Sequence, residues 1–263
     1  MKVVMFGHTR RIFRQTAAMT VAALIASVDA AADARVAESL ARYFQVRPGG
    51  YGDGDRFIGV KLSELRRIVK PYLRAGLPLA ELEGALASEV HEHRLVVLVL
   101  LADRADRAVR SRSADPAELA AIHGFYLRAI RYVDNWDLVD CSAPQIVGGY
   151  LLDKPRAELD ELVASTNIWS RRIALVATLR LIAAGQTADT YRLAERVLGD
   201  PEDLIHKASG WMLREAGKRV DTGELCAFLD EHAARMPRTM LRYAIERLPD
   251  DVRRKYLAVR RIA

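Results

Sequence analysis

Arg171-Arg172-Ile173-Ala174 places basic residues at the start of an apolar helical pattern, and this arrangement returns further along the chain. The next two copies are His206-Lys207-Ala208-Ser209 and Leu241-Arg242-Tyr243-Ala244, so Arg172, Lys207 and Arg242 are spaced 35 residues apart. An earlier copy, His93-Arg94-Leu95-Val96, puts Arg94 78 residues before Arg172, close to two periods. Repeats of about 35–47 residues that each form a helix pair are typical of HEAT-like solenoids. We therefore predict an all-α, superhelical solenoid of HEAT-like repeats.

The rest of the chain also carries helical periodicity, with little of the alternation that is typical of strands. Residues 20–44 are predicted to be helical with a turn at 29–33, and a glycine-rich loop at 47–55 follows as a connector. Proline and glycine mark most of the later boundaries, and Pro144 falls inside one predicted segment. The further predicted helices are 63–73, 78–87, 90–102, 116–131, 136–152, 156–165, 168–184, 187–198, 202–218, 222–234, 238–247 and 249–258.

A repeated cation has a direct consequence in a solenoid, because the second helices of the repeats line one concave surface. One basic residue per repeat would make a basic stripe close to helix N-termini, where phosphate groups bind well. The predicted DNA-contacting cations of this stripe are Arg94, Arg172, Lys207 and Arg242. The alternative interpretation is that these are solvated helix charges with an accidental period.

Composition favours an anionic partner. The 263 residues are 51% hydrophobic and 28% charged, with a net charge of +6 and a pI near 9.4, which puts nucleic acid first and an anionic membrane surface second. Only two cysteines are present, so no disulfide framework is implied and we expect a reducing, cytoplasmic location. No apolar run approaches the roughly 20 residues that span a bilayer.

The domain organisation is expected to be simple. Residues 1–18 are predicted to be an extension, either without fixed structure or not translated, because Met19 can serve as the start. Residues 19–263 are predicted to form a single solenoid domain that acts as a monomer.

Common catalytic motifs are missing from the sequence. It contains no Gly-x-Ser-x-Gly, Gly-x-Gly-x-x-Gly or Cys-x-x-Cys, which argues against the common hydrolases, dinucleotide enzymes and redox enzymes. The glycine-rich loop lacks the Gly-Lys-Ser/Thr of a phosphate loop. His91 and His93 are two residues apart and face different ways on a helix, so no metal site is expected.

The segment Asn135-Trp136-Asp137-Leu138-Val139-Asp140 offers a different chemistry. If Asn135 caps a helix, Trp136 and Asp140 lie on one face, one turn apart. An aromatic face beside a carboxylate can stabilise a cation that has been removed from water. The alternative is that Trp136 is a core residue and Asp140 caps a helix over 142–152.

Three separated segments resemble the AlkD-like alkylpurine DNA glycosylases, which are DNA alkylation repair enzymes. They are Asn135–Asp140, Asn167-Ile168-Trp169-Ser170-Arg171-Arg172 and Gly210-Trp211-Met212-Leu213-Arg214-Glu215, and Ala41-Arg42-Tyr43 adds to them. The resemblance covers roughly residues 20–258, and it departs from the family in the extension 1–18 and in the glycine-rich loop. It implies a HEAT-like solenoid whose concave face wraps duplex DNA.

The resemblance also implies roles for individual residues. Asp140 matches the catalytic aspartate, Trp136 and Trp211 match two tryptophans that flank the lesion sugar, and Arg172 and Tyr43 match residues of the same cleft. The implied reaction is hydrolysis of the N-glycosidic bond of N3-methyladenine or N7-methylguanine in duplex DNA, leaving an abasic site, with no metal or organic cofactor. The competing hypothesis is a HEAT-repeat module that binds DNA or a protein and has no catalytic activity.

Overall fold

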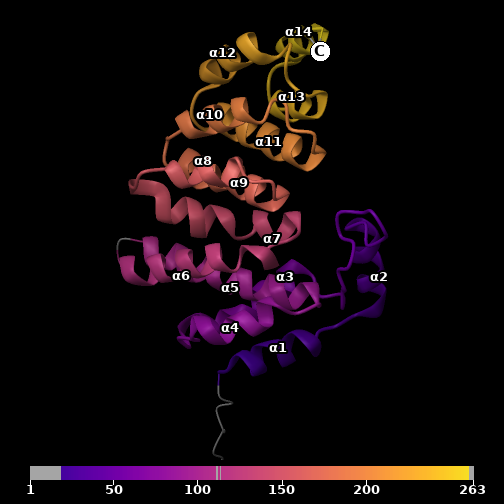
Figure 1. Ribbon diagram of the computed structural model, residues 1–263, viewed down its shortest axis with the longest axis vertical. Coiled ribbons are helices and arrows are strands. Elements are labelled where there is room, and N and C mark those ends of the chain that lie inside the picture. The colour runs from indigo at the N-terminus through magenta and orange to yellow at the C-terminus, as the bar shows by residue number, and fades with distance from the viewer. Residues whose placement is uncertain (1–18, 111, 113, 261–263) are drawn as a thin grey trace, which may run out of the picture.

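The computed structural model describes residues 19–110, 112 and 114–260, and within them the protein is built from helices alone (Figure 1). This part of the chain contains no strand, only an isolated bridge between Arg56 and Val90. The predicted all-α class is therefore confirmed. The extension predicted at residues 1–18 lies outside the described residues. Among the described helices, none is both long and apolar enough to cross a membrane.

Fourteen α-helices are present in the described chain, and most of their bounds follow the predicted segments closely. They are α1 Val21–Asp29, α2 Ala34–Tyr43, α3 Leu62–Val69, α4 Leu79–Leu86, α5 His91–Val109, α6 Pro116–Arg128, α7 Trp136–Asp140, α8 Ala157–Val163, α9 Ile168–Ala183, α10 Ala188–Arg196, α11 Asp203–Arg219, α12 Thr222–His232, α13 Arg238–Ala244 and α14 Asp250–Ala258. The predicted helix 90–102 is too short, because α5 continues to Val109. Short 3₁₀ segments cover Lys70–Arg74, Ile130–Tyr132 and Leu151–Asp153, and a π-helical turn covers Pro144–Gly148.

The helices are arranged as a stack of pairs along the long axis of the molecule (Figure 1). Within pairs, α4 packs on α5, α8 on α9, and α10 on α11. Between pairs, α9 packs on α11 and α11 packs on α13, so the second helices of successive repeats form one layer. Helix α2 lies beside this stack and buries none of its own residues (Figure 1).

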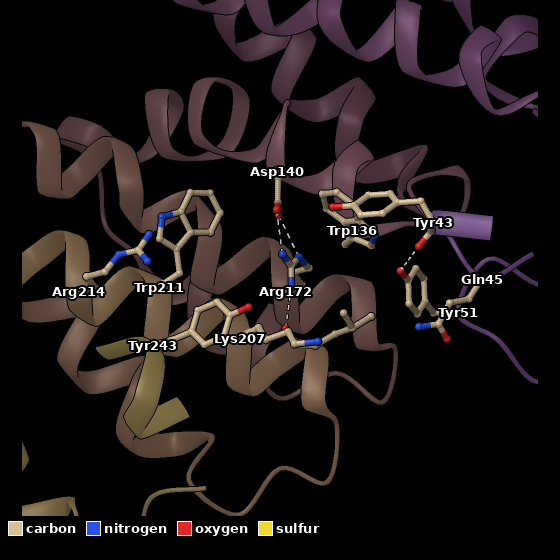
Figure 2. A pocket seen from close by; sticks show the side chains of 11 residues that line it. Tyr43, Gln45, Tyr51, Trp136, Asp140, Arg172, Lys207, Trp211, Arg214 and Tyr243 are labelled. Atoms are coloured by element: carbon tan, nitrogen blue, oxygen red, sulfur yellow. Dashed lines mark hydrogen bonds and ion pairs between the residues drawn. The ribbon is translucent and has the colours of Figure 1, made fainter. Parts of the chain in front are cut away.

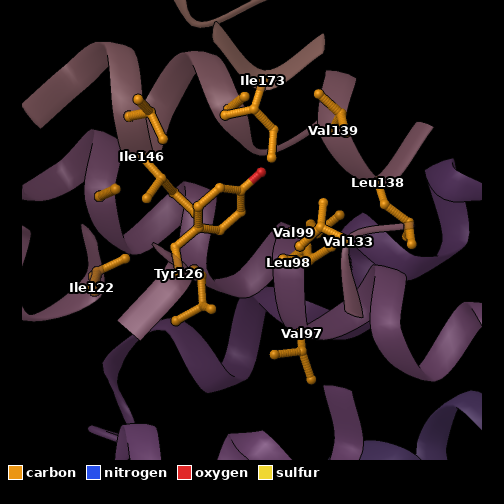
Figure 3. Close-up of a cluster of buried hydrophobic side chains, with 14 of the residues drawn as sticks. Val97, Leu98, Val99, Ile122, Tyr126, Val133, Leu138, Val139, Ile146 and Ile173 are labelled. Atoms are coloured by element: carbon orange, nitrogen blue, oxygen red, sulfur yellow. The ribbon is translucent and has the colours of Figure 1, made fainter. Parts of the chain in front are cut away.

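A continuous apolar core runs through the stack from α1 to α11. Helix α5 forms its centre, because every residue from Leu95 to Ala102 is buried. Tyr126 is fully buried beside Ile146 and Ile173 (Figure 3), and its hydroxyl lies 3.0 Å from the Ser142 hydroxyl. This contact satisfies the one polar group that the tyrosine carries into the core.

The predicted helix 136–152 is interrupted, as the proline inside it suggested. Pro144 has no N–H to donate to the carbonyl of Asp140, so the α-helical ladder stops there. The Ser142 hydroxyl donates to the Leu138 carbonyl instead, and the chain continues through the π-helical turn. Helix α7 therefore ends at Asp140.

Candidate active site

The main candidate site is a cavity of about 400 Å³, called the cleft below, which opens between α2, α7, α9, α11 and α13 (Figure 2). All five residues that the family resemblance assigns to a common site line the cleft, and Lys207 lines it as well. The five are Tyr43, Trp136, Asp140, Arg172 and Trp211. The complete lining consists of Tyr43, Gln45, Tyr51, Trp136, Asp140, Arg172, Leu204, Lys207, Trp211, Arg214 and Tyr243.

A carboxylate–guanidinium pair lies at the centre of the cleft. Arg172 donates from Nε to Asp140 Oδ1 at 2.9 Å and from Nη2 to Asp140 Oδ2 at 2.8 Å. A further donation from Arg172 Nη1 to the Leu204 carbonyl, at 2.6 Å, fixes the guanidinium on α9 against α11. The interpretation of Asp140 as a helix cap is therefore wrong, because its two oxygens bind Arg172 across the helix stack.

Burial sets the electrostatics of this pair. The Asp140 side chain is only 19% exposed, and burial raises the pKa of its carboxyl although the charge of Arg172 lowers it in part. The negative charge is therefore incompletely compensated by its surroundings. A cation placed in the cleft next to Asp140 would stabilise the carboxylate and be stabilised by it.

Two of the three tryptophans face the cleft from different helices (Figure 2). The Asn135 side chain caps α7 by accepting from the Trp136 N–H at 2.8 Å, as predicted. The Trp136 ring stacks on Phe44 at 5.0 Å between centroids and meets the edge of Tyr43 at 5.9 Å. Trp211 enters from α11, whereas Trp169 packs against the core and does not line the cleft.

The predicted DNA-contacting cations do not share one environment. Lys207 lines the cleft, and its hydrogen bond to Asp203 raises its pKa, so it stays charged. Arg242 is exposed but lies outside the cleft lining. Arg94 is 5% exposed and donates to Asp55 and the Ser88 carbonyl, which makes it part of the folded scaffold. The regular period places these cations on equivalent helices. Whether a cationic side chain is buried in the scaffold or faces the cleft depends on the carboxylates near it in the fold.

Five lining residues were missing from the sequence interpretation: Gln45, Tyr51, Leu204, Arg214 and Tyr243. Arg214 could have been found, because it lies at helical spacing from Lys207 and Trp211 on α11. The position of the glycine-rich loop depends on tertiary contacts, so no local signal marks Gln45 or Tyr51. The loop is thus more than a connector.

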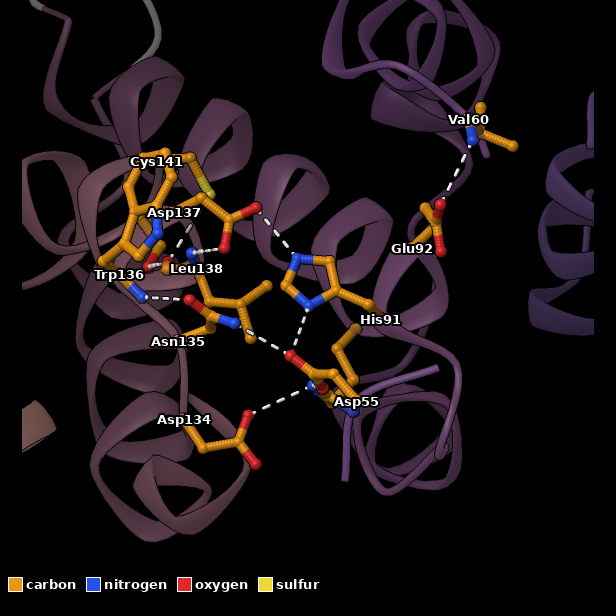
Figure 4. Close-up of polar contacts among 12 residues, drawn as sticks. Asp55, Val60, His91, Glu92, Asp134, Asn135, Trp136, Asp137, Leu138 and Cys141 are labelled. Atoms are coloured by element: carbon orange, nitrogen blue, oxygen red, sulfur yellow. Dashed lines mark hydrogen bonds and ion pairs between the residues drawn. The ribbon is translucent and has the colours of Figure 1, made fainter. Parts of the chain in front are cut away.

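A buried polar network lies behind Trp136 and joins the glycine-rich loop to α5 and α7 (Figure 4). The ring of His91 bridges Asp55 Oδ2, 3.1 Å from Nδ1, and Asp137 Oδ2, 2.8 Å from Nε2. The Asn135 amide also donates to Asp55 Oδ2, at 2.8 Å. These contacts fix both neighbours of Trp136 in the chain and hence the direction of the indole ring.

The charges in this network are coupled. Burial alone lowers the pKa of His91, but the hydrogen bonds of Asp137 and Asp55 outweigh it and raise the pKa to about 9. Burial raises the pKa of Asp55, yet His91 and Arg94 lower it to about 2 overall. At neutral pH His91 is therefore an imidazolium that donates from both ring nitrogens.

We expect this imidazolium to make stability depend on pH. Because the pKa of His91 is about 9 in the folded protein and 6.5 as an ordinary value, its contribution is complete below pH 6.5 and is lost as pH rises through 9. Thermal unfolding should show Tm falling by several degrees across that interval. This decrease in Tm should be clearly smaller in His91→Gln, whereas the control His206→Gln should show the same decrease as the wild type. Equal dependence of Tm on pH in the wild type and both variants would contradict this role of His91.

Within the described residues, no group of three or more His, Cys, Asp or Glu side chains is arranged to hold a metal ion.

Comparison with known proteins supports the resemblance seen in the sequence. A model of the family described as DNA alkylation repair enzyme matches residues 24–248. A solved structure described as a predicted DNA alkylation repair enzyme from Enterococcus faecalis is similar in fold, with a TM-score of 0.62 and 20% identity over 83% of this chain and 97% of the other. No curated protein matches the chain.

Proposed function

The chain belongs to the DNA alkylation repair enzymes, and from this premise we propose that it is a monofunctional DNA glycosylase acting on positively charged alkylpurines. Its substrates would be N3-methyladenine and N7-methylguanine in duplex DNA, and its product an abasic site. The observation that carries the proposal is the largely buried Asp140 carboxylate in a cleft that Trp136 and Trp211 also line.

The reaction requires little beyond these groups. Alkylation at purine N3 or N7 makes the base cationic, so it leaves as a neutral molecule while positive charge develops on the deoxyribose. Asp140 would stabilise this oxocarbenium-like sugar and orient the water that attacks it. The faces of Trp136 and Trp211 would attract the same charge. Because the leaving base needs no proton, the cleft needs no general acid.

The cations around the cleft would hold the DNA backbone. Lys207 and Arg214 line the cleft on α11, and Arg242 is exposed on α13. Contacts of lysine and arginine with phosphates position a duplex without reading its sequence. Arg172 is buried and donates to Asp140 and the Leu204 carbonyl, so it would act mainly by positioning the Asp140 carboxylate. We further propose that residues 19–263 act as one domain, as a monomer in the cytoplasm and without a cofactor.

The test is an incubation of the purified protein with duplex DNA that carries N7-methylguanine or N3-methyladenine. Chromatography should detect the free modified base, and alkali should then cleave the strand at the abasic site. DNA binding without release of a base would instead establish the non-catalytic HEAT-repeat module. The presence of Trp136, Asp140, Arg172 and Trp211 in one cleft favours the enzyme, since a pure binding module has no need to bury a carboxylate there.

A further inference from the structure

Gln45 has an unusual backbone conformation at the edge of the cleft. Its φ is +53°, and no other described residue except glycine has a positive φ. A side chain in this left-handed region costs free energy, which is why glycine or asparagine usually occupies it. The Gln45 side chain lines the cleft, and its amide forms no hydrogen bond with any described residue. Gln45 is exposed, so its amide is free to meet a ligand in the cleft.

The end of α2 and the glycine-rich loop together set this conformation. The Gln45 N–H donates to the Arg42 carbonyl at 3.2 Å and the Val46 N–H donates to the Ala41 carbonyl at 2.9 Å, which is the bonding pattern of a helix that ends on a left-handed residue. A Cβ atom on Gly50 would lie 2.1 Å from the Gln45 carbonyl oxygen, and one on Gly52 would lie 2.3 Å from the Phe44 carbonyl oxygen. Only glycine at these two positions lets the loop fold back so closely on the end of α2. The Gln45 carbonyl also accepts from the Arg47 N–H at 2.8 Å.

The loop is fixed on the scaffold at two points. In its middle, the Tyr51 hydroxyl donates to the Tyr43 carbonyl at 2.9 Å, which keeps both tyrosines at the cleft. At its end, Asp55 binds His91 and the Asn135 side chain, so the loop is attached to the helix that carries Trp136. Figure 2 shows Tyr43, Gln45 and Tyr51 on one side of the cleft and Trp211 and Arg214 on the other.

We propose that Gln45 determines specificity by hydrogen-bonding the edge of a base at or next to the lesion. This inference rests on the proposed function, because it takes the cleft to bind damaged duplex DNA. A neutral amide is a poor partner for phosphate compared with lysine or arginine, but it offers both a donor and an acceptor. Base edges present such pairs of groups, and glutamine is well suited to them. The left-handed turn at the end of α2 then sets the direction in which that amide meets the DNA.

The experiment measures binding and needs no catalysis. The probes are duplexes that carry a tetrahydrofuran abasic analogue and differ in the base opposite it and in the two neighbouring base pairs. For the wild type we expect Kd to vary about tenfold across this panel, as one good base contact allows. Gln45→Ala keeps the backbone strain and removes the amide. The variation of Kd across the panel should therefore fall to about twofold, while Tm should stay unchanged.

Two further variants separate the amide from the backbone and from the loop. Gln45→Gly removes both the amide and the strain, so it should lose the same discrimination while Tm stays level or rises by about 2 °C. Arg47→Ala is the control, because Arg47 is exposed in the same loop but does not line the cleft. Arg47→Ala should change Kd by the same factor for every duplex, so the variation of Kd across the panel should equal that of the wild type.

Three results would overturn the inference: a wild type that binds the whole panel equally, a Gln45→Ala variant with undiminished variation, or an equal loss of affinity for every duplex. Because the analogue carries no base, a failure to release alkylated purines would contradict the proposed function without affecting this measurement.

Discussion

Asp140→Asn should slow base excision by about 10²–10³-fold while leaving duplex binding intact, because the variant removes a charge that acts only as positive charge develops on the sugar. An asparagine oxygen can still accept a hydrogen bond from Arg172, so the cleft keeps its shape. The loss of a negative charge cannot weaken attraction to a polyanion, and Kd should therefore be unchanged or slightly lower. Single-turnover release of N7-methylguanine and a binding titration measure the two quantities.

Asp134→Asn is the matched control for this variant. Asp134 lies six residues before Asp140, but its side chain is 48% exposed, pairs with Arg94 and does not line the cleft. Excision by this control should equal that of the wild type. If Asp140→Asn retained wild-type rates, the proposed role of the carboxylate would be wrong.

Arg172→Gln is expected to have the second-largest effect, and that effect should depend on pH. Burial already raises the pKa of Asp140, and Arg172 is the main group that opposes this. Without the guanidinium, the pKa of Asp140 must rise further, so the carboxyl becomes protonated at a higher pH than in the wild type. We expect excision at neutral pH to fall at least about tenfold, with the acidic limb of the rate profile moved to higher pH.

Raising the pH should therefore recover more activity in Arg172→Gln than in the wild type. Arg171→Gln provides a neighbouring control, because Arg171 pairs with Asp200 and does not line the cleft. Its pH profile should coincide with that of the wild type. A uniform loss of rate in Arg172→Gln, with no displacement of the profile, would mean that Arg172 acts on DNA alone and not through Asp140.

Much of the fold could be predicted from local sequence patterns. Apolar residues at helical spacing and boundaries at proline and glycine placed most helices to within a few residues, because these signals act over a single turn. The exceptions are the ends of α5, at Val109 instead of 102, and of α7, at Asp140 instead of 152. The repeat of cations at Arg172, Lys207 and Arg242 indicated a stack of similar helix pairs. The π-helical turn after α7 could not be foreseen in detail, since Pro144 announces a break but not how the chain continues.

The cleft was partly predictable for a different reason. Asp140, Trp136 and Trp211 lie in motifs that resemble a known family, and the structure places them in one cavity. Arg94 shows the limit of the periodic pattern, because Asp55 comes from the glycine-rich loop and draws its guanidinium inward. The side chains of that loop reach the cleft through contacts between residues distant in sequence, which no local pattern encodes.

The central claim is that Asp140 stabilises positive charge on the sugar, and binding of two abasic analogues tests it most directly. One duplex carries a pyrrolidine whose nitrogen is cationic at the position of the sugar charge, and the other carries a neutral tetrahydrofuran. The wild type should bind the cationic analogue about 10²-fold more tightly, as expected for an analogue of the transition state, and Asp140→Asn should lose this preference. Equal affinity of the wild type for both duplexes would contradict the account.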